Sequence, residues 1–324
     1  MTNQLFSIPV SVIVPAKNEE NNLPACLQSI APADEIFVVD SQSNDRTAEI
    51  AVYYGAKVVQ FYFPGDWPKK KNWSLENLPF RNEWVMIVDC DERITPELWQ
   101  EIAIAIKQPD YDGYYLNRKV IFLGKWLRYG GRYPDWNMRL FRHKKGRYEN
   151  LHTEDVPNTG DNEIHEHVLL KGKFGYLKND MIHEDFRDIY QWLERHNRYS
   201  NWEARVYYNF LTGRYNEDSI KGQTILPNFW GNAVERKRWL RQFWVRYVPF
   251  KPLLRFTTIY VFLLGFLDGM AGYIYARLMS HYEYQIGVKI YELKRFGGKL
   301  NIAKKANDNN DENSANLPQP DINL

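Results

Sequence analysis

The chain has 324 residues, enough for one large domain or two ordinary ones with a sizeable core. Its formal net charge is +2, so no overall positive field supports binding to nucleic acid. The two cysteines, Cys26 and Cys90, do not indicate a disulfide framework, and we expect a reducing, cytoplasmic environment. No basic segment followed by an apolar stretch precedes Val10, so we expect no secretory signal peptide.

Short apolar runs alternate with helical patterns through the first third of the chain. The runs that predict strands are residues 10–14, 35–39, 57–61 and 84–88. The patterns that predict helices cover residues 23–30, 47–54, 73–78 and 96–106. This alternation predicts an α/β fold with a doubly wound, mostly parallel sheet.

Polar side chains follow three of the predicted strands at the point where each strand ends. Asn18 and Glu19 follow the first strand, Asp40 ends the second, and Asp89 and Asp91 follow the fourth. Ligands of such sheets bind beyond the carboxyl ends of the strands. We therefore expect these side chains to converge on one crevice.

The fourth predicted strand runs directly into the acidic sequence DCDE, residues 89–92. Crowded carboxylates repel one another, so a positive group is expected beside them. A divalent cation that holds a phosphate is the obvious candidate. The alternative at this point is a strand end followed by an acidic helix N-cap.

The pattern changes after residue 110. Aromatic and basic residues alternate over residues 111–148, which predicts a small antiparallel extension of the sheet. Residues 151–163 have the composition of a loop, and residues 188–211 predict a long helix.

The C-terminal third is basic and aromatic. Residues 256–275 are largely apolar and approach the roughly 20 residues of a membrane span, but Asp268 and interior glycines argue against a simple one. Positive charge flanks this segment on both sides, which suits helices lying on or dipping into an anionic leaflet. The alternative is a buried helical hairpin. The tail, residues 300–324, lacks apolar residues for packing and is predicted to be disordered.

Several motifs in register resemble family 2 glycosyltransferases of GT-A fold. They are PAKNEENNL, VVDSQSNDRT, KKKNWSLE and VDCDERIT. Later segments resemble the lipopolysaccharide-core β-glycosyltransferase branch: RLFR, IHEHV, ERHNRYSNWEA and GFLDG. The resemblance implies a catalytic domain over residues 1–211, with a nucleotide-sugar half over about 8–110 and an acceptor half over about 111–211. A helical, membrane-associating region is expected over residues 212–299.

The resemblance implies seven donor-binding residues: Pro15, Asn18, Glu19, Asp40, Lys71, Asn72 and Asp89. Glu19 is expected near the uracil and ribose, and Asp40 is expected to accept a hydrogen bond from the base. A helix-capping role is the alternative for Asp40, but other cap candidates follow it directly. Lys71 and Asn72 are implied to face the diphosphate.

The resemblance also implies a divalent cation, Mn²⁺ or Mg²⁺, with Asp91 as its direct ligand. Asp89 and His183 are further candidate ligands, and a helix-start position is the alternative for His183. Glu92 is expected in the first turn of the following helix, where negative charge is favoured. Cys90 is expected to point into the sheet.

Four further cations lie within these motifs. Lys69 and Lys70 are expected to be solvated. Arg139 and Arg142 are candidates for contact with phosphate or acceptor, and surface ion pairing is an equal alternative.

An inverting transfer needs a base that deprotonates the acceptor hydroxyl. The resemblance of IHEHV, followed by His183, to the narrower branch favours Glu166, and an acidic pair in the wider family leaves Asp155 as the alternative. His165 and His167 form an H-x-H pair without further zinc ligands at a suitable spacing, so a zinc site is not expected.

The resemblance therefore implies a metal-dependent, inverting hexosyltransferase. Its donor would be a UDP-hexose, and its acceptor a lipid-linked saccharide such as lipopolysaccharide core or another cell-envelope glycan. We expect a cytoplasmic protein peripherally associated with the inner face of the cell membrane. Transfer onto a polyprenyl phosphate and a non-catalytic nucleotide-sugar-binding role are the alternatives.

Overall fold

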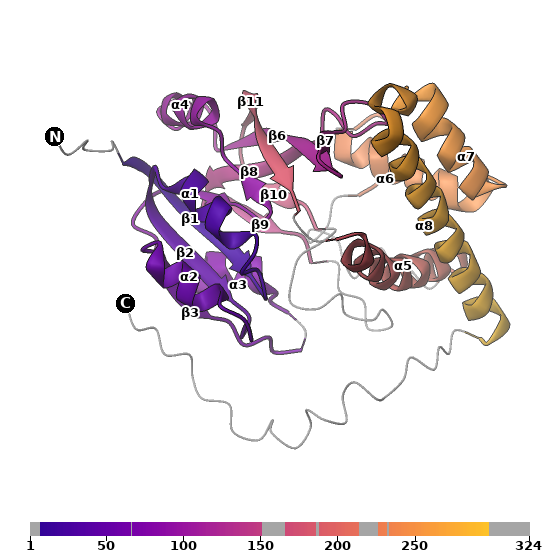
Figure 1. Cartoon of the computed structure of the whole chain (residues 1–324), viewed down its shortest axis with the longest axis horizontal. Helices are drawn as coiled ribbons and strands as arrows, with labels where there is room; N and C mark the ends of the chain where they lie inside the picture. Colours follow the sequence, from indigo (N-terminus) through magenta and orange to yellow (C-terminus); the bar gives the residue numbers. More distant parts are fainter. Residues whose placement is uncertain are drawn as a thin grey trace, which may run out of the picture.

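The computed structural model describes residues 7–65, 67–150, 166–185, 188–213, 226–231 and 233–297. One large sheet organises these residues, in the strand order β3-β2-β1-β4-β8-β6-β11-β5 (Figure 1). Its first half is parallel and consists of β1 (Ile8–Ala16), β2 (Ala33–Asp40), β3 (Lys57–Gln60) and β4 (Trp84–Ile87). All four were predicted from their apolar runs.

Helices cover both faces of this parallel half. They are α1 (Leu23–Ile30), α2 (Thr47–Tyr53), α3 (Lys70–Asn77) and α4 (Pro96–Ala105). Strand residues alternate between the two cores, so Val12 and Val14 pack with α1 and α4 while Ile13 packs with α3. The Thr95 hydroxyl starts α4 by accepting the Leu98 N–H at 3.2 Å. The doubly wound arrangement is confirmed.

The second half of the sheet is mixed. Strand β8 (Trp136–Arg142) pairs antiparallel with β4 and β6 (Gly113–Phe122), and β6 turns back into β7 (Lys125–Trp126). Strand β11 (Phe174–Glu184) runs parallel to β6, and the short β5 (Glu92–Arg93) pairs antiparallel with it. A separate pair joins β9 (Gly146–Tyr148) to β10 (Val168–Leu170). The predicted antiparallel extension, and with it the GT-A type of fold, is confirmed; β11 and β5 were not predicted.

Helices follow the sheet in the chain. They are α5 (Ile189–Leu211), α6 (Ala233–Tyr247), α7 (Lys251–Thr257) and α8 (Gly269–Arg295). A π-helical turn η2 (Thr258–Phe262) and a 3₁₀ turn η3 (Gly265–Asp268) join α7 to α8. The predicted apolar segment 256–275 is therefore broken rather than continuous.

The C-terminal helices pack on the sheet half that precedes them. Helices α5 and α8 lie side by side (Figure 1), and Tyr208 of α5 shares a core with Ile286 of α8. Phe122 and Leu127 share another core with Ala271. The domain boundary at residues 211 and 212 stays a prediction. The tail at 300–324 lies outside the described residues.

Within the described ranges, no single helix is long and apolar enough to cross a bilayer. The pair Lys251–Phe262 and Gly265–Arg295, bent by 71°, meets that length and composition only when taken together.

Candidate active site

A cavity of about 1050 Å³ opens at the carboxyl edge of the parallel strands. Pro15, Glu19, Asp89 and Asp91 lie on its strand side, and Glu166 also lines it. The opposite wall comes from β6, β8, α5 and α8. The expected convergence on one crevice is therefore observed for the residues that end β1 and follow β4.

Asp40 is buried at the end of β2 and orders the loop that follows. Its carboxylate accepts hydrogen bonds from the Ser43 backbone and hydroxyl and, at 3.0 Å, from the Gln60 amide. Helix α2 begins after Arg46 without a side-chain cap, so the capping alternative for Asp40 is wrong.

The loops after β1 and β2 are cross-linked through Asn18. Its N–H donates to the Ser43 hydroxyl at 2.8 Å, and its Oδ1 accepts from the Asn44 N–H at 2.8 Å. Asn18 has a left-handed backbone with φ of 54°, which Asn tolerates better than most residues. Glu19 beside it accepts from the Asn22 amide at 2.8 Å. These hydrogen bonds order the two loops at the edge of the cavity, where the sequence predicts that the nucleoside binds.

The basic segment at the start of α3 points inward. Lys70 is fully buried and donates to the Ala16 carbonyl at 2.7 Å, and Lys71 lies 3.1 Å from Asp89 Oδ1. The buried Asn72 amide is bonded twice to the Tyr148 backbone, at 2.9 Å each way. The solvated role expected for Lys70 is wrong. Asn72 is occupied in holding β9, so we do not carry it forward as a diphosphate ligand.

Asp89 and Glu92 share one buried arginine. Arg139 lies 2.5 Å from Asp89 Oδ2 and 2.6 Å from Glu92 Oε1, and the Asp89 N–H donates to Glu92 Oε2 at 2.9 Å. Burial opposes ionisation of Asp89, but Arg139 and Lys71 outweigh it and hold its pKa far below the ordinary value. Asp89 is thus fixed as an anion by two protein cations.

Two sequence predictions are corrected by this network. Glu92 is fully buried in β5, and α4 starts only at Pro96, so the helix-start role of Glu92 is wrong. Arg139 makes internal ion pairs rather than surface ones. Arg142 lies elsewhere, 4.8 Å over the ring of Trp84 and paired with Glu83. Cys90 is buried in the core as predicted, and both cysteines are free.

Asp91 faces His183, which pairing between β5 and β11 brings across from a distant part of the chain. His183 Nδ1 is 3.4 Å from Asp91 Oδ1, and their side chains are 26% and 13% exposed. Burial opposes ionisation of Asp91, but His183 outweighs it and lowers the pKa of the carboxyl. The helix-start alternative for His183 is wrong, because it lies on β11.

The surroundings of Asp91 and His183 show whether the two side chains could bind a divalent cation. His183 Nδ1 is buried and makes no hydrogen bond within the described part of the chain. In the same ranges, no group of three or more His, Cys, Asp or Glu side chains is arranged to hold a metal ion. Mg²⁺ typically binds through one or two carboxylates together with substrate phosphates. The pair fits a metal that is completed by a diphosphate rather than by a full protein cage.

Glu166 is paired with Lys69. The Lys69 Nζ is 2.5 Å from Glu166 Oε1, and their side chains are only 12% and 4% exposed. The solvated role expected for Lys69 is therefore wrong. His167 is bonded to the buried Glu149. Asp155 and His165 lie outside the described residues.

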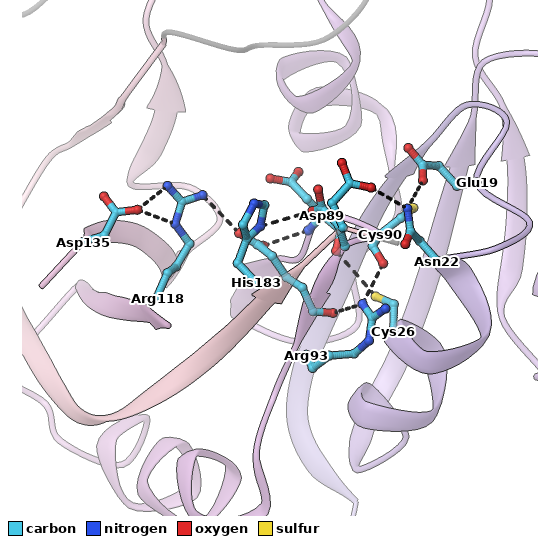
Figure 2. A network of polar contacts seen from close by, with 12 residues as sticks. Glu19, Asn22, Cys26, Asp89, Cys90, Arg93, Arg118, Asp135 and His183 are labelled. Atoms are coloured by element: carbon cyan, nitrogen blue, oxygen red, sulfur yellow. Dashed lines mark hydrogen bonds and ion pairs between the residues drawn. The ribbon is translucent and has the colours of Figure 1, made fainter. Parts of the chain in front are cut away.

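The cavity wall opposite the strands was missed as a site. Its Tyr and Trp members are Tyr115, Trp136, Trp192, Tyr199, Trp202 and Tyr275. Arg118 links the two sides, because it bonds Asp135 at 2.7 Å and lies 3.4 Å from Glu92; Figure 2 shows it between Asp135 and the group around His183. The only sequence signal was the high Trp and Tyr content, which does not say which rings meet.

Comparison with known proteins identifies relatives of the first part of the chain. Residues 11–161 match the family model described as Glycosyl transferase family 2. An uncharacterized glycosyltransferase of Rickettsia conorii is 28% identical over 213 residues, which cover 63% of this chain and 72% of that protein. The lipopolysaccharide core biosynthesis glycosyltransferase LpsC of Rhizobium meliloti is 25% identical over 213 residues, or 61% of this chain and 71% of that protein. The resemblance seen in the motifs is confirmed.

Among solved structures, the glucosyl-3-phosphoglycerate synthase from Mycobacterium tuberculosis in complex with Mn²⁺, UDP and glucosyl-3-phosphoglycerate gives a TM-score of 0.29 at 25% identity. The match covers 34% of this chain and 43% of the synthase chain, so this chain spans less than half of the synthase's length.

Proposed function

We propose that the chain, whose residues 11–161 match the model of glycosyl transferase family 2, is an inverting hexosyltransferase with a UDP-hexose donor. One observation carries this proposal. A single cavity gathers the fixed anion Asp89, the Asp91–His183 pair and the buried carboxylate Glu166. Such a site offers separate places for a diphosphate leaving group and for a base.

The donor would lie along the carboxyl edge of β1, β2 and β4. Glu19 lines the cavity and would accept a hydrogen bond from the uracil or ribose. Asp40, buried at the end of β2 and bonded to Ser43 and Gln60, is retained as the proposed acceptor for the base. Asp89 would accept from a sugar or ribose hydroxyl. Lys71, 3.1 Å from Asp89, is the cation nearest to the expected diphosphate in our proposal.

Asp91 would hold the divalent cation, with His183 as its second protein ligand. A bound Mn²⁺ or Mg²⁺ supplies charge that stabilises the departing diphosphate. Pairing of β11 with β5 sets His183 opposite Glu92, next to Asp91, which supports this role. The protein would contribute two ligands, His183 on β11 and Asp91 immediately before β5.

Glu166 would act as the base. It lines the cavity and is almost fully buried, and its carboxylate lies 2.5 Å from the Lys69 ammonium, which holds it in place. Transfer of the acceptor hydroxyl proton to Glu166 would accompany attack on the anomeric carbon from the face opposite the diphosphate. Lys69 is a positioning residue in this scheme, because it touches the base and not the reacting sugar.

The acceptor would be a lipid-linked saccharide, met by the aromatic wall. Tyr and Trp rings present flat apolar faces with a polar edge, which suit the faces of sugars. The relative LpsC, named for lipopolysaccharide core biosynthesis, supports this acceptor class over a polyprenyl phosphate. The protein would work at the inner face of the cell membrane, where such acceptors are assembled.

Calorimetric titration with UDP tests the donor site directly. We expect Mn²⁺ to strengthen UDP binding to the wild type, and Asp91→Asn to lose that gain while keeping metal-free binding. Asp40→Ala should weaken UDP binding with and without metal. Equal affinity of wild type and Asp91→Asn in Mn²⁺ would contradict the metal assignment.

A comparison of acceptors tests the base. A polyprenyl phosphate is already an anion and needs little base catalysis, whereas a sugar hydroxyl needs deprotonation. Glu166→Gln should nearly abolish transfer to a saccharide. Near-normal turnover of this variant with a polyprenyl phosphate alone would support the rival acceptor.

A further inference from the structure

The junction between α7 and α8 exposes a group of apolar side chains that have no role in the cavity. We name it the apolar tip; its members are Val261, Phe262, Leu263, Leu264, Phe266, Leu267 and Met270. Phe262 is 76% exposed and Met270 is 72% exposed. Contiguous exposed apolar surface of this kind marks an interaction site on soluble proteins.

The tip is held in a defined shape by close backbone contacts. A Cβ at Gly265 would lie 2.6 Å from the Ile259 carbonyl, and one at Gly272 would lie 2.0 Å from the Gly265 carbonyl. Leu264 adopts a left-handed backbone with φ of 58°. The chain therefore turns by 71° in a compact corner that directs its apolar side chains outward.

The surroundings of the tip carry positive charge. Lys125 and Arg128 are exposed beside it: Lys125 Nζ lies 3.5 Å from where a Cβ of Gly269 would be, and the Arg128 N–H bonds Asp268. Arg277 is exposed farther along α8, over the ring of Phe256. Residues 113–132 and 248–280 contain a single acid, Asp268. Asp268 is buried and accepts the N–H groups of Arg128 and Tyr129 at 3.2 and 2.9 Å, so it offers no exposed negative charge.

The tip is joined to the cavity wall. The Leu263 carbonyl accepts the Gly130 N–H at 2.8 Å, beside the two bonds of Asp268. The same loop carries Leu127 and Arg132, which line the cavity. A surface that engages the tip would therefore lie beside the acceptor side of the site.

We propose that the apolar tip inserts into the acyl boundary of an anionic phospholipid leaflet. Outward apolar side chains gain by leaving water, and a cationic rim without exposed acid complements anionic headgroups. A protein partner with an acidic patch would match the rim equally, but the apolar members form a corner rather than a groove. This assignment deepens the proposed function, on which it rests for the lipid-linked acceptor.

Vesicle co-sedimentation of the full chain tests the assignment. We expect the wild type to bind vesicles of phosphatidylglycerol and phosphatidylcholine, and the Phe262→Ser, Met270→Ser double variant to lose at least about tenfold in partition coefficient. Val52→Ser with Tyr53→Ser is the matched control, because these α2 residues are 64% and 84% exposed and lie far from the tip (Figure 1). Control binding should equal that of the wild type.

Unchanged binding of the tip variant would overturn the assignment. The assignment would also fail if the wild type bound no vesicles and formed a dimer in sedimentation velocity while the tip variant stayed monomeric. The tip would then contact a second copy of the chain. Equal binding to pure phosphatidylcholine would overturn its anionic part. Vesicle binding requires neither donor nor turnover, so its failure is separate from failure of the proposed transfer.

A depth measurement keeps the test independent of variant folding. Both native cysteines are buried, so a spin label at Met270→Cys can be compared with one at Tyr53→Cys. We expect oxygen, which concentrates in the acyl region, to relax the label at position 270 more strongly once vesicles are added. Equal accessibility of the two labels to oxygen would contradict insertion.

Discussion

At the residue scale, the centre of the site is a network of charges in which Arg139 and Glu92 are buried and Asp89 reaches the cavity. Arg139 is 5% exposed and neutralises Asp89 and the fully buried Glu92. The sequence drew attention to the acids of DCDE but did not indicate their partners. Arg139 lies 47 residues beyond Glu92, and only pairing of β8 with β4 brings them together.

Arg139→Ala should therefore be strongly destabilising. Removing one partner of a buried ion pair leaves an uncompensated charge, which costs about 3–5 kcal/mol of unfolding free energy. Urea denaturation measures this cost. Arg46→Ala is the control, because its pair with Glu49 is 75% exposed on both sides and should contribute less than about 1 kcal/mol. A loss below about 1 kcal/mol for Arg139→Ala would contradict the network.

The lowered pKa of His196 predicts that the stability of the folded chain decreases as the pH falls. Burial lowers the pKa of His196 from 6.5 to about 4, helped by Arg195 and Arg132 and opposed by its bond to the Trp192 carbonyl. The unfolded chain binds this proton first as the pH falls, so stability is full above about 6.5 and is lost on approach to 4.

Replacing His196 with Phe keeps the stacking on Trp192 and removes the titration. We expect the wild type to lose about 2 kcal/mol more stability than His196→Phe between pH 7 and 5, an order-of-magnitude value. Chemical denaturation at the two pH values measures the difference. Parallel losses in both proteins would show that His196 is not held neutral.

At the scale of elements, the sequence predicted the strands and helices whose formation depends on residues close together in the chain. The strand runs of β1 to β4 and the apolar face of α1 needed only neighbouring residues. Strand β5 has two residues and exists because β11 pairs with it, so no local pattern could predict it. The same pairing brings His183 close to Asp91. The sequence suggested His183 only through the family resemblance, because no local pattern links it to Asp91.

The corner between η3 and α8 makes a prediction about glycine. Gly272→Ala would place a Cβ 2.0 Å from the Gly265 carbonyl, so the corner must open, at a cost of about 1–3 kcal/mol. Gly287→Ala lies in the same helix with nothing within 4 Å and should stabilise by about 0.5–1 kcal/mol. Thermal denaturation of both variants checks the opposite signs. Stabilisation by Gly272→Ala would show that the corner is not tightly closed.

At the scale of the whole molecule, the aromatic wall of the cavity is built from segments that are distant in sequence. Aromatic residues of β6, β8, α5 and α8 meet in one wall, and Asp268 fastens the C-terminal helices to the loop after β7. Composition indicated many Trp and Tyr side chains without indicating their meeting place. The C-terminal region therefore contributes part of the cavity wall, through Tyr275 and Met279.

The most direct test of the proposed transfer is release of UDP from UDP-hexoses, measured with Mn²⁺ and a lipid-linked saccharide acceptor. We predict release that depends on acceptor, is lost in Asp91→Asn and Glu166→Gln, and persists in the surface control Val52→Ser with Tyr53→Ser. Release at background with every UDP-hexose and acceptor tried, from protein that still binds UDP, would contradict a transferase and indicate a nucleotide-sugar-binding role.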